Sequence, residues 1–190
     1  MKKQIRILGI DDAPFSFSNK KTSIIGVILR GNDYLEGVLH RHISIDGDDA
    51  TAVCSQMTQQ TRHRNQLKAA LIDGIALGGF NIVDIDEVYS LTNLPVLTIT
   101  RNKPDVEKIK HALQNHFTDW KQRWDLINKA ELWKISTSYK PVYVQAAGLT
   151  KLEAKDIISL STIRGAIPEP IRIAHLIASG ITKGESYGKA

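Results

Sequence analysis

Within the first 45 positions, two short apolar runs, the second rich in β-branched residues, are followed by a run whose residues alternate between two sides with a period of two, and such runs are typical of β-strands. Three strands are predicted, over residues 4–10, 22–30 and 34–45. Gly31-Asn32-Asp33 separates the last two strands and predicts a hairpin. The start of the chain is therefore expected to form an antiparallel meander.

Beyond residue 46 the apolar period lengthens to that of helices, and these alternate with short strands. Thr150 and Glu153 form the pattern of a helix-capping box, and Gly180 is expected to end the last helix. Residues 183–190 are expected to be a loose tail. The predicted helices are 50–64, 82–91, 104–117, 119–128, 150–162 and 169–179, and the predicted strands are 67–72, 95–100, 131–137 and 142–147.

This order predicts an α/β fold, a mixed sheet of five or slightly more strands flanked by helices. It matches the ribonuclease H-like fold, in which the strand after the first helix pairs in parallel with the first strand. With 190 residues, 42% of them hydrophobic, the chain is expected to form one domain over residues 1–190. No apolar run approaches the ~20 residues of a membrane span. The single cysteine, Cys54, excludes an internal disulfide and favours a cytoplasmic location.

Carboxylates stand where two of the predicted strands end. Asp11 and Asp12 follow the first strand, Asp73 follows the strand 67–72, and Asp49 begins the intervening helix. If the two strands are parallel neighbours, their ends lie about 5 Å apart, and the acids repel one another unless a cation binds. Oxygen ligands favour Mg²⁺ or Mn²⁺, and metal-assisted phosphodiester hydrolysis is the chemistry that follows. Taken singly, each aspartate is more commonly a turn residue or a helix cap.

Basic residues lie toward the same edge of the predicted sheet. The net charge of +5 gives a weak preference for polyanions. Arg101 and Lys103 follow the strand 95–100 and are the best candidates for binding a nucleic-acid backbone. Arg172 and His175 share one face of the last helix. If that face covers the acidic edge, Arg172 binds a phosphate and His175 transfers a proton; otherwise the pair faces solvent.

Several aromatic residues allow two interpretations each. Phe80, after Gly78-Gly79, either stacks on a nucleic-acid base or packs inside the protein. The two glycines either let a phosphate approach backbone N–H groups or form a plain turn. Trp120 and Trp124 lie one helical turn apart, which fits a core position or a partner surface. A homodimer through these tryptophans is compatible with the sequence, which does not require it.

Five motifs, specific only in combination, are distributed along nearly the whole chain: GIDDAPF (9–15), DGDDAT (46–51), DGIALGGFNIVDID (73–86), LPVLTITRNKP (94–104) and IPEPIRIAHLIASGITKGES (167–186). With these motifs the chain resembles the archaeal domain-of-unknown-function family number ninety-nine, a sister group of endonuclease V. Endonuclease V has a Gly-hydrophobic-Asp on its first strand, matched by Asp11, and an Asp-Gly ending its fourth, matched by Asp73. The resemblance implies an endonuclease V-like fold and a magnesium site.

The chain also departs from endonuclease V at three places. The Arg-Glu pair of the third strand has no counterpart, so Asp49 is taken as a spatial replacement for its catalytic glutamate. Residues 78–81 stand in place of a His-Pro-Arg run, and no aromatic-proline wedge is present. These departures weaken the expectation of inosine-directed cleavage more than that of nucleic-acid contact.

The sequence thus predicts a metal-dependent nuclease-like protein that acts on DNA or RNA. Asp11, Asp73 and Asp49 are the expected metal ligands, and Asp12 is a substitute ligand or general base. Two alternatives remain: a catalytically silent module that binds nucleic acid or protein on the same fold, and an enzyme that uses the Gly78-Gly79 loop on a small phosphorylated metabolite.

Overall fold

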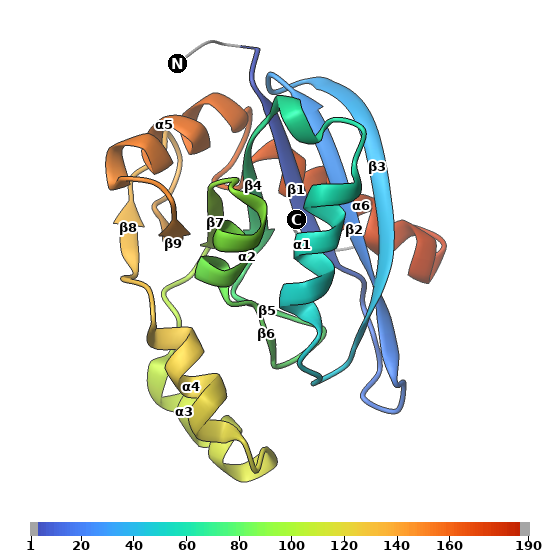
Figure 1. The fold of residues 1–190 in the computed structure, drawn as a ribbon, viewed down its shortest axis with the longest axis vertical. Coiled ribbons are helices and arrows are strands. Elements are labelled where there is room, and N and C mark those ends of the chain that lie inside the picture. Colours follow the sequence, from blue (N-terminus) through green and yellow to red (C-terminus); the bar gives the residue numbers. More distant parts are fainter. Residues whose placement is uncertain (1–3, 187–190) are drawn as a thin grey trace.

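A seven-stranded mixed β-sheet forms the centre of the structure, a computed structural model that describes residues 4–186 (Figure 1). The fourth strand of the chain pairs in parallel with the first, as the ribonuclease H-like topology requires. The seventh strand extends the parallel part, and the remaining pairs are antiparallel. Across the sheet the order is β3 (Tyr34–Ser44), β2 (Lys21–Arg30), β1 (Arg6–Asp12), β4 (Leu67–Asp73), β7 (Val96–Thr100), β9 (Val142–Ala147) and β8 (Trp133–Ile135).

Helices cover both faces of this sheet (Figure 1). On one face, α1 (Ala50–Gln60) and α2 (Ile85–Thr92) pack on inward residues of the central strands, and Cys54 is buried there. On the other face lie α5 (Lys151–Ser161) and α6 (Glu169–Lys183). Two apolar layers therefore enclose the sheet, as the sequence pattern predicted. No helix in the described part of the chain is long and apolar enough to cross a membrane.

The carboxyl ends of the parallel strands carry extra elements. A two-stranded ladder of β5 (Ala76–Leu77) and β6 (Asn81–Ile82) follows β4. An antiparallel pair of helices, α3 (Val106–His116) and α4 (Trp120–Asn128), follows β7 and projects beyond the sheet at this edge (Figure 1). The β5–β6 ladder and the α3–α4 pair therefore lie at the edge of the sheet where the sequence predicted the acidic residues.

Several predicted boundaries differ from the structure. The helix predicted over 50–64 ends at Gln60, and a short 3₁₀ helix, Arg64–Gln66, precedes β4. The helix predicted over 82–91 begins at Ile85, because the Asp84 side chain accepts hydrogen bonds from the backbone of the first turn. The strand predicted over 131–137 is limited to Trp133–Ile135.

The last helix is longer than predicted. It continues through Gly180 to Lys183, and Gly184 ends it with a φ of 83°. A left-handed glycine is the usual helix stop, whereas glycine inside a helix costs only about 1 kcal/mol. Of the expected loose tail 183–190, residue 183 belongs to the helix and residues 187–190 lie outside the described part.

Gly9 lets this helix lie directly against the central strand β1. A Cβ atom at Gly9 would lie 2.6 Å from the amide nitrogen of Ile171, nearer than side-chain carbons approach a backbone. The first turn of α6 therefore rests on the main chain of β1, which fixes the height of the helix above the sheet.

Candidate metal centre and adjoining pocket

Three side chains that are far apart in the sequence meet at the carboxyl edge of the sheet. Asp11 comes from β1, Asp73 ends β4, and His175 comes from α6. One ligand atom from each lies within 4.8 Å of the other two. His175 Nδ1 and Asp11 Oδ2 are hydrogen-bonded at 2.8 Å. The parallel pairing of β1 with β4 brings the two carboxylates together, and α6 adds the imidazole.

The alternation of side chains along β1 decides which aspartate faces the helix. Gly9 contacts α6, so Asp11, two residues further, points to the same face. Asp12 points to the opposite face, where its Oδ2 accepts a hydrogen bond of 2.7 Å from the Gly78 amide. Asp12 thus fastens the loop after β4, and its expected role as ligand or base stays a prediction.

Burial raises the pKa of both carboxyl groups of this cluster, because it disfavours their charged forms. Asp11 is 3% exposed, and burial raises its pKa to about 7, helped by repulsion from Asp73 and Asp12 and opposed by the His175 hydrogen bond. Burial also raises the pKa of Asp73, against the attraction of Arg101. The hydrogen bond to Asp11 raises the pKa of His175. The cluster therefore favours a bound positive charge, which protons or a cation can supply.

The donor set fits a divalent cation. Two carboxylate oxygens are the hard ligands that Mg²⁺ and Mn²⁺ prefer, and imidazole nitrogen is a ligand that suits several transition metals. The separation of at most 4.8 Å between the ligand atoms of Asp11, Asp73 and His175 is short enough for one ion to contact all three.

Asp49 does not join this cluster, contrary to its predicted place as the third acid. Its carboxylate accepts hydrogen bonds from the Ser44 amide at 3.0 Å, the Ser44 hydroxyl at 2.9 Å and the Asn81 side chain at 2.6 Å. These bonds close the loop that leads into α1. His175, which the sequence offered as a proton carrier or a surface residue, occupies the third position instead.

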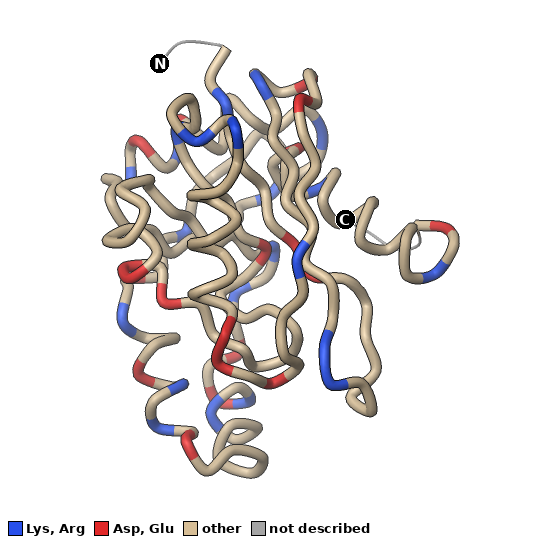
Figure 2. Tube along the Cα trace, turned by 45° about the vertical axis from the view of Figure 1, so that its right-hand side comes forward, with Lys and Arg blue, Asp and Glu red and all other residues tan. Residues whose placement is uncertain are grey.

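The basic candidates differ in the groups with which they interact. Arg101 is close enough to lower the pKa of Asp73. Arg172 forms a salt bridge of 2.6 Å with Glu169 on its own helix. Lys103 lines a pocket that begins next to Asp73. Lysine, arginine and acidic residues are interspersed along the chain, so the net positive charge is not gathered on one element (Figure 2).

The glycine loop is already occupied by carboxylates of the protein itself. The Gly78 amide donates to Asp12, and the Phe80 amide donates to Asp46 Oδ1 at 2.8 Å. These N–H groups are not open to a phosphate, which argues against the metabolite alternative. Phe80 packs edge-to-face on Phe117, with ring centroids 5.6 Å apart.

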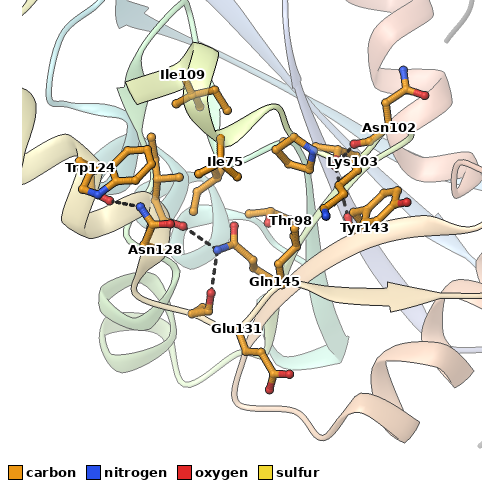
Figure 3. Close-up of a pocket in the computed structure, with 18 of the residues that line it drawn as sticks. Ile75, Thr98, Asn102, Lys103, Ile109, Trp124, Asn128, Glu131, Tyr143 and Gln145 are labelled. Carbon is orange, nitrogen blue, oxygen red and sulfur yellow. Dashed lines mark hydrogen bonds between the residues drawn. The ribbon is translucent and has the colours of Figure 1, made fainter. Parts of the chain in front are cut away.

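A pocket of about 590 Å³ begins at Gly74, the residue after Asp73, and extends under α3 and α4 (Figure 3). Ile75, Phe80 and Trp124 are among its apolar lining residues. Trp124 also lines this pocket. A homodimer through Trp120 and Trp124, which the sequence allows without requiring it, stays a prediction.

Two polar pocket residues, Thr98 and Gln145, were missed by the sequence reasoning. Gln145 stands in the strand VYVQAA and is 6% exposed. A glutamine inside an apolar strand needs hydrogen-bond partners, and that is the signal that could have marked it. The sequence could not show that its neighbour across the sheet is Thr98.

The comparisons with known proteins agree with this architecture. Residues 3–182 match the family described as Endonuclease dU. A UPF0215 protein of Methanosarcina mazei is 50% identical over 193 residues, which cover 100% of this chain and 97% of that protein. The crystal structure of a protein of unknown function from Archaeoglobus fulgidus is 40% identical with a TM-score of 0.84, covering 94% of this chain and 98% of the other.

A more distant likeness shows the fold class. Endonuclease V of Ciona intestinalis, in complex with DNA that contains an inosine followed by a ribo-adenosine, has a TM-score of 0.61 at 15% identity. The likeness covers 96% of this chain and 87% of that one. The endonuclease V-like, ribonuclease H-like fold expected from the sequence is thereby confirmed. The identification of this family with domain-of-unknown-function family number ninety-nine stays a prediction.

Proposed function

Because this chain belongs to the Endonuclease dU family, we propose that it is a divalent-metal-dependent endonuclease that hydrolyses a phosphodiester bond of nucleic acid. The observation that carries the proposal is the convergence of Asp11, Asp73 and His175 within 4.8 Å at the carboxyl edge of the sheet. The description of the family supports DNA that contains deoxyuridine as the substrate.

Each residue of the cluster has a task that follows from its position. Asp11 and Asp73 would hold Mg²⁺ or Mn²⁺ through one carboxylate oxygen each, and His175 through a ring nitrogen. The ion, when bound, supplies a Lewis acid for a phosphoryl oxygen and lowers the pKa of water. The α6 helix holds the imidazole against the sheet, and the Asp11 carboxylate orients the ring.

Arg101 and Lys103 are the residues proposed to bind the substrate backbone. Both follow β7 at the edge that carries the cluster, and the charge of Arg101 reaches Asp73. A guanidinium at this position can bind a phosphate oxygen with two hydrogen bonds. Arg172 is a weaker candidate, because the Glu169 carboxylate neutralises it.

The test is cleavage of an oligonucleotide that carries one deoxyuridine, compared with the same oligonucleotide that carries deoxycytidine. With Mg²⁺ or Mn²⁺ the wild-type chain is expected to cut the first strand. Asp11→Asn and Asp73→Asn should lower the rate by at least about two orders of magnitude, because each removes a charged ligand. Asp156→Asn, at an exposed position of α5, is the matched control and should leave the rate unchanged.

Absence of cleavage on DNA and RNA substrates, with either metal, would overturn the nuclease proposal. If the chain then still binds nucleic acid, and Asp11→Asn binds equally well, the catalytically silent module is the correct description. Binding that weakens steeply with salt would identify its contacts as mainly phosphate contacts.

A further inference from the structure

The pocket beside the cluster combines apolar walls with a few polar groups, as a site for a flat heterocycle would. Its walls are aromatic and aliphatic, with Trp124, Ile75 and Ile109 among them (Figure 3). Its volume of about 590 Å³ is within the range of small-ligand sites. A nucleobase matches such a site, because its two faces are apolar and its edge carries hydrogen-bonding groups.

Gln145, at the inner side of the pocket, is held in one orientation. Its Nε2 group donates to the carbonyl of Ile127 at 2.7 Å and to the carbonyl of Ala130 at 2.9 Å. Both N–H groups are used, so the amide cannot exchange its nitrogen and oxygen without losing two hydrogen bonds. The carbonyl oxygen is therefore the group that Gln145 offers to the pocket, where it points toward Ile75 (Figure 3).

Thr98 lies beside this oxygen on the neighbouring strand. Thr98 of β7 and Gln145 of β9 are register partners in the antiparallel pair, so their side chains lie on the same face of the sheet. Thr98 is 3% exposed, and both residues line the pocket. A hydroxyl beside a fixed carbonyl oxygen can donate to one atom of a ligand while the carbonyl accepts from the next.

The pocket and the cluster share one edge of the sheet but not one face. Leu71 and Leu97 pack on the α5 side, so Asp73 points to that side and Thr98, next to Leu97, points to the other. Gly74, which follows Asp73, connects the two sites along the chain. A nucleic-acid strand that crosses this edge can place a phosphate at the cluster and a nearby base in the pocket.

We propose that this pocket binds one extruded base of the substrate and that Gln145 and Thr98 select a keto base by its ring N–H and the adjacent carbonyl. The inference rests on the proposed function. Gln145 accepts the ring N–H, and Thr98 donates to the carbonyl oxygen beside it. The base leaves the stack to reach the pocket, and the bond that is hydrolysed belongs to a neighbouring nucleotide, because the cluster lies on the opposite face.

The test compares two oligonucleotides that differ only in the proposed recognition group. One carries a single deoxyuridine, and the other carries N3-methyldeoxyuridine, in which a methyl group replaces the ring N–H and both carbonyls remain. Binding is measured by fluorescence anisotropy with Ca²⁺ in place of Mg²⁺. The wild-type chain is expected to bind the deoxyuridine strand at least about tenfold more tightly, the effect of one buried hydrogen bond.

Three variants assign this preference to the pocket. Gln145→Leu removes the acceptor of the ring N–H and should bring the affinity ratio toward one. Thr98→Val keeps the shape of the side chain and removes the donor to the carbonyl, which both strands carry, so it should weaken binding of the deoxyuridine strand and is judged by that affinity. Gln145→Leu also leaves two carbonyls without donors, so Gln59→Leu is its matched control. Gln59 donates to the carbonyl of Leu91 away from the pocket, and its variant should keep the wild-type ratio.

Equal affinity of the wild-type chain for the two strands would overturn the inference. An unchanged ratio in Gln145→Leu would also overturn it, as would an unchanged affinity of Thr98→Val for the deoxyuridine strand. Cleavage assays on the same strands with Mg²⁺ separate the two proposals. Cleavage without preference for the ring N–H rejects the base pocket alone. Preference without cleavage rejects the nuclease and leaves the pocket supported.

Discussion

At the scale of single residues, the hydrogen bond between Asp11 and His175 is the feature with the largest consequences. It joins a nearly inaccessible carboxyl group to an imidazole that is 27% exposed. Burial opposes the charge on Asp11, whereas the imidazole favours it. Without a metal ion, the cluster therefore retains protons at a pH at which ordinary aspartates have lost them.

This retention predicts a stability that decreases as the pH rises. The folded-state pKa of Asp11 is about 7 and its ordinary value is 3.8, so the folded state binds more protons than the unfolded state between these values. The raised pKa of His175 acts in the same direction. The free energy of unfolding in EDTA should fall as the pH rises through this window, and urea unfolding at a series of pH values measures it.

Asp11→Asn should remove most of this dependence. An amide cannot ionise, so the variant is expected to be more stable than the wild-type chain above pH 7, by about 2 kcal/mol. This expected gain is smaller than the free energy that corresponds to the whole pKa shift of Asp11, because an asparagine side chain makes a weaker hydrogen bond to His175 than the carboxylate does. Parallel stability curves for the two chains would show that Asp11 ionises normally and would contradict the raised pKa.

The sequence predicted some site residues and missed others for identifiable reasons. Asp11 and Asp73 followed from strand order, because parallel neighbours must end side by side. Asp49 was misplaced because its contacts with Ser44 and Asn81 depend on a loop that has no sequence period. The direction of His175 depends on the rotation of a helix about its axis, which the sequence left open between two faces.

At the scale of elements, the packing of α6 on β1 controls the geometry of the cluster. The contact at Gly9 involves backbone atoms of Pro170 and Ile171, which cannot move aside as a side-chain end can. Since His175 follows one helical turn later, any displacement of this turn also displaces the imidazole.

Gly9→Ala should therefore destabilise the chain by about 1–3 kcal/mol, the usual cost of overpacking a core. Cleavage should fall as well, because α6 must move away from Asp11. Gly180→Ala is the control: nothing lies within 4 Å of a Cβ at that helical position, and the change should be neutral or slightly stabilising. Urea unfolding and the cleavage assay measure both, and a Gly9→Ala chain as stable as wild type would contradict the close packing.

The length of α6 shows where local sequence signals end. Gly180 is expected to stop the helix, yet α6 continues to Lys183 and ends at the left-handed Gly184. The packed apolar residues of α6 end at Ala178 and Ile181 is exposed, so the position of the left-handed glycine sets the end, at the small cost of an interior glycine. The short strands β5 and β6 were also missed, because two residues each are too few to show a period.

At the scale of the whole molecule, metal binding should be visible as a change in global stability. A ligand that binds only the folded chain stabilises it by about 2.7 kcal/mol at a hundredfold excess over Kd. Mn²⁺ is therefore expected to raise the Tm, and more at pH 8 than at pH 5.5, because protons compete for the carboxylates. Asp73→Asn should abolish most of the increase, whereas an equal increase in that variant would locate the ion elsewhere.

The fold was predictable as a whole, while the pocket was not. The order of strands and helices is local information along the chain, and it indicated the parallel pairing of β1 with β4 correctly. Thr98 and Gln145 become neighbours only through the antiparallel pairing of β7 with β9, and the α3–α4 pair covers them from outside the sheet. Such relations follow from tertiary packing and leave no repeating pattern in the sequence.

The place of His175 in the chain has a consequence for biosynthesis. Its partner Asp11 stands 164 positions earlier, so a ribosome makes both carboxylates long before it makes the imidazole. A nascent or truncated polypeptide that stops short of α6 carries the two acids and lacks the imidazole. The hydrolysis proposed for the protein uses all three side chains, so it is expected to arise only after α6 has left the exit tunnel.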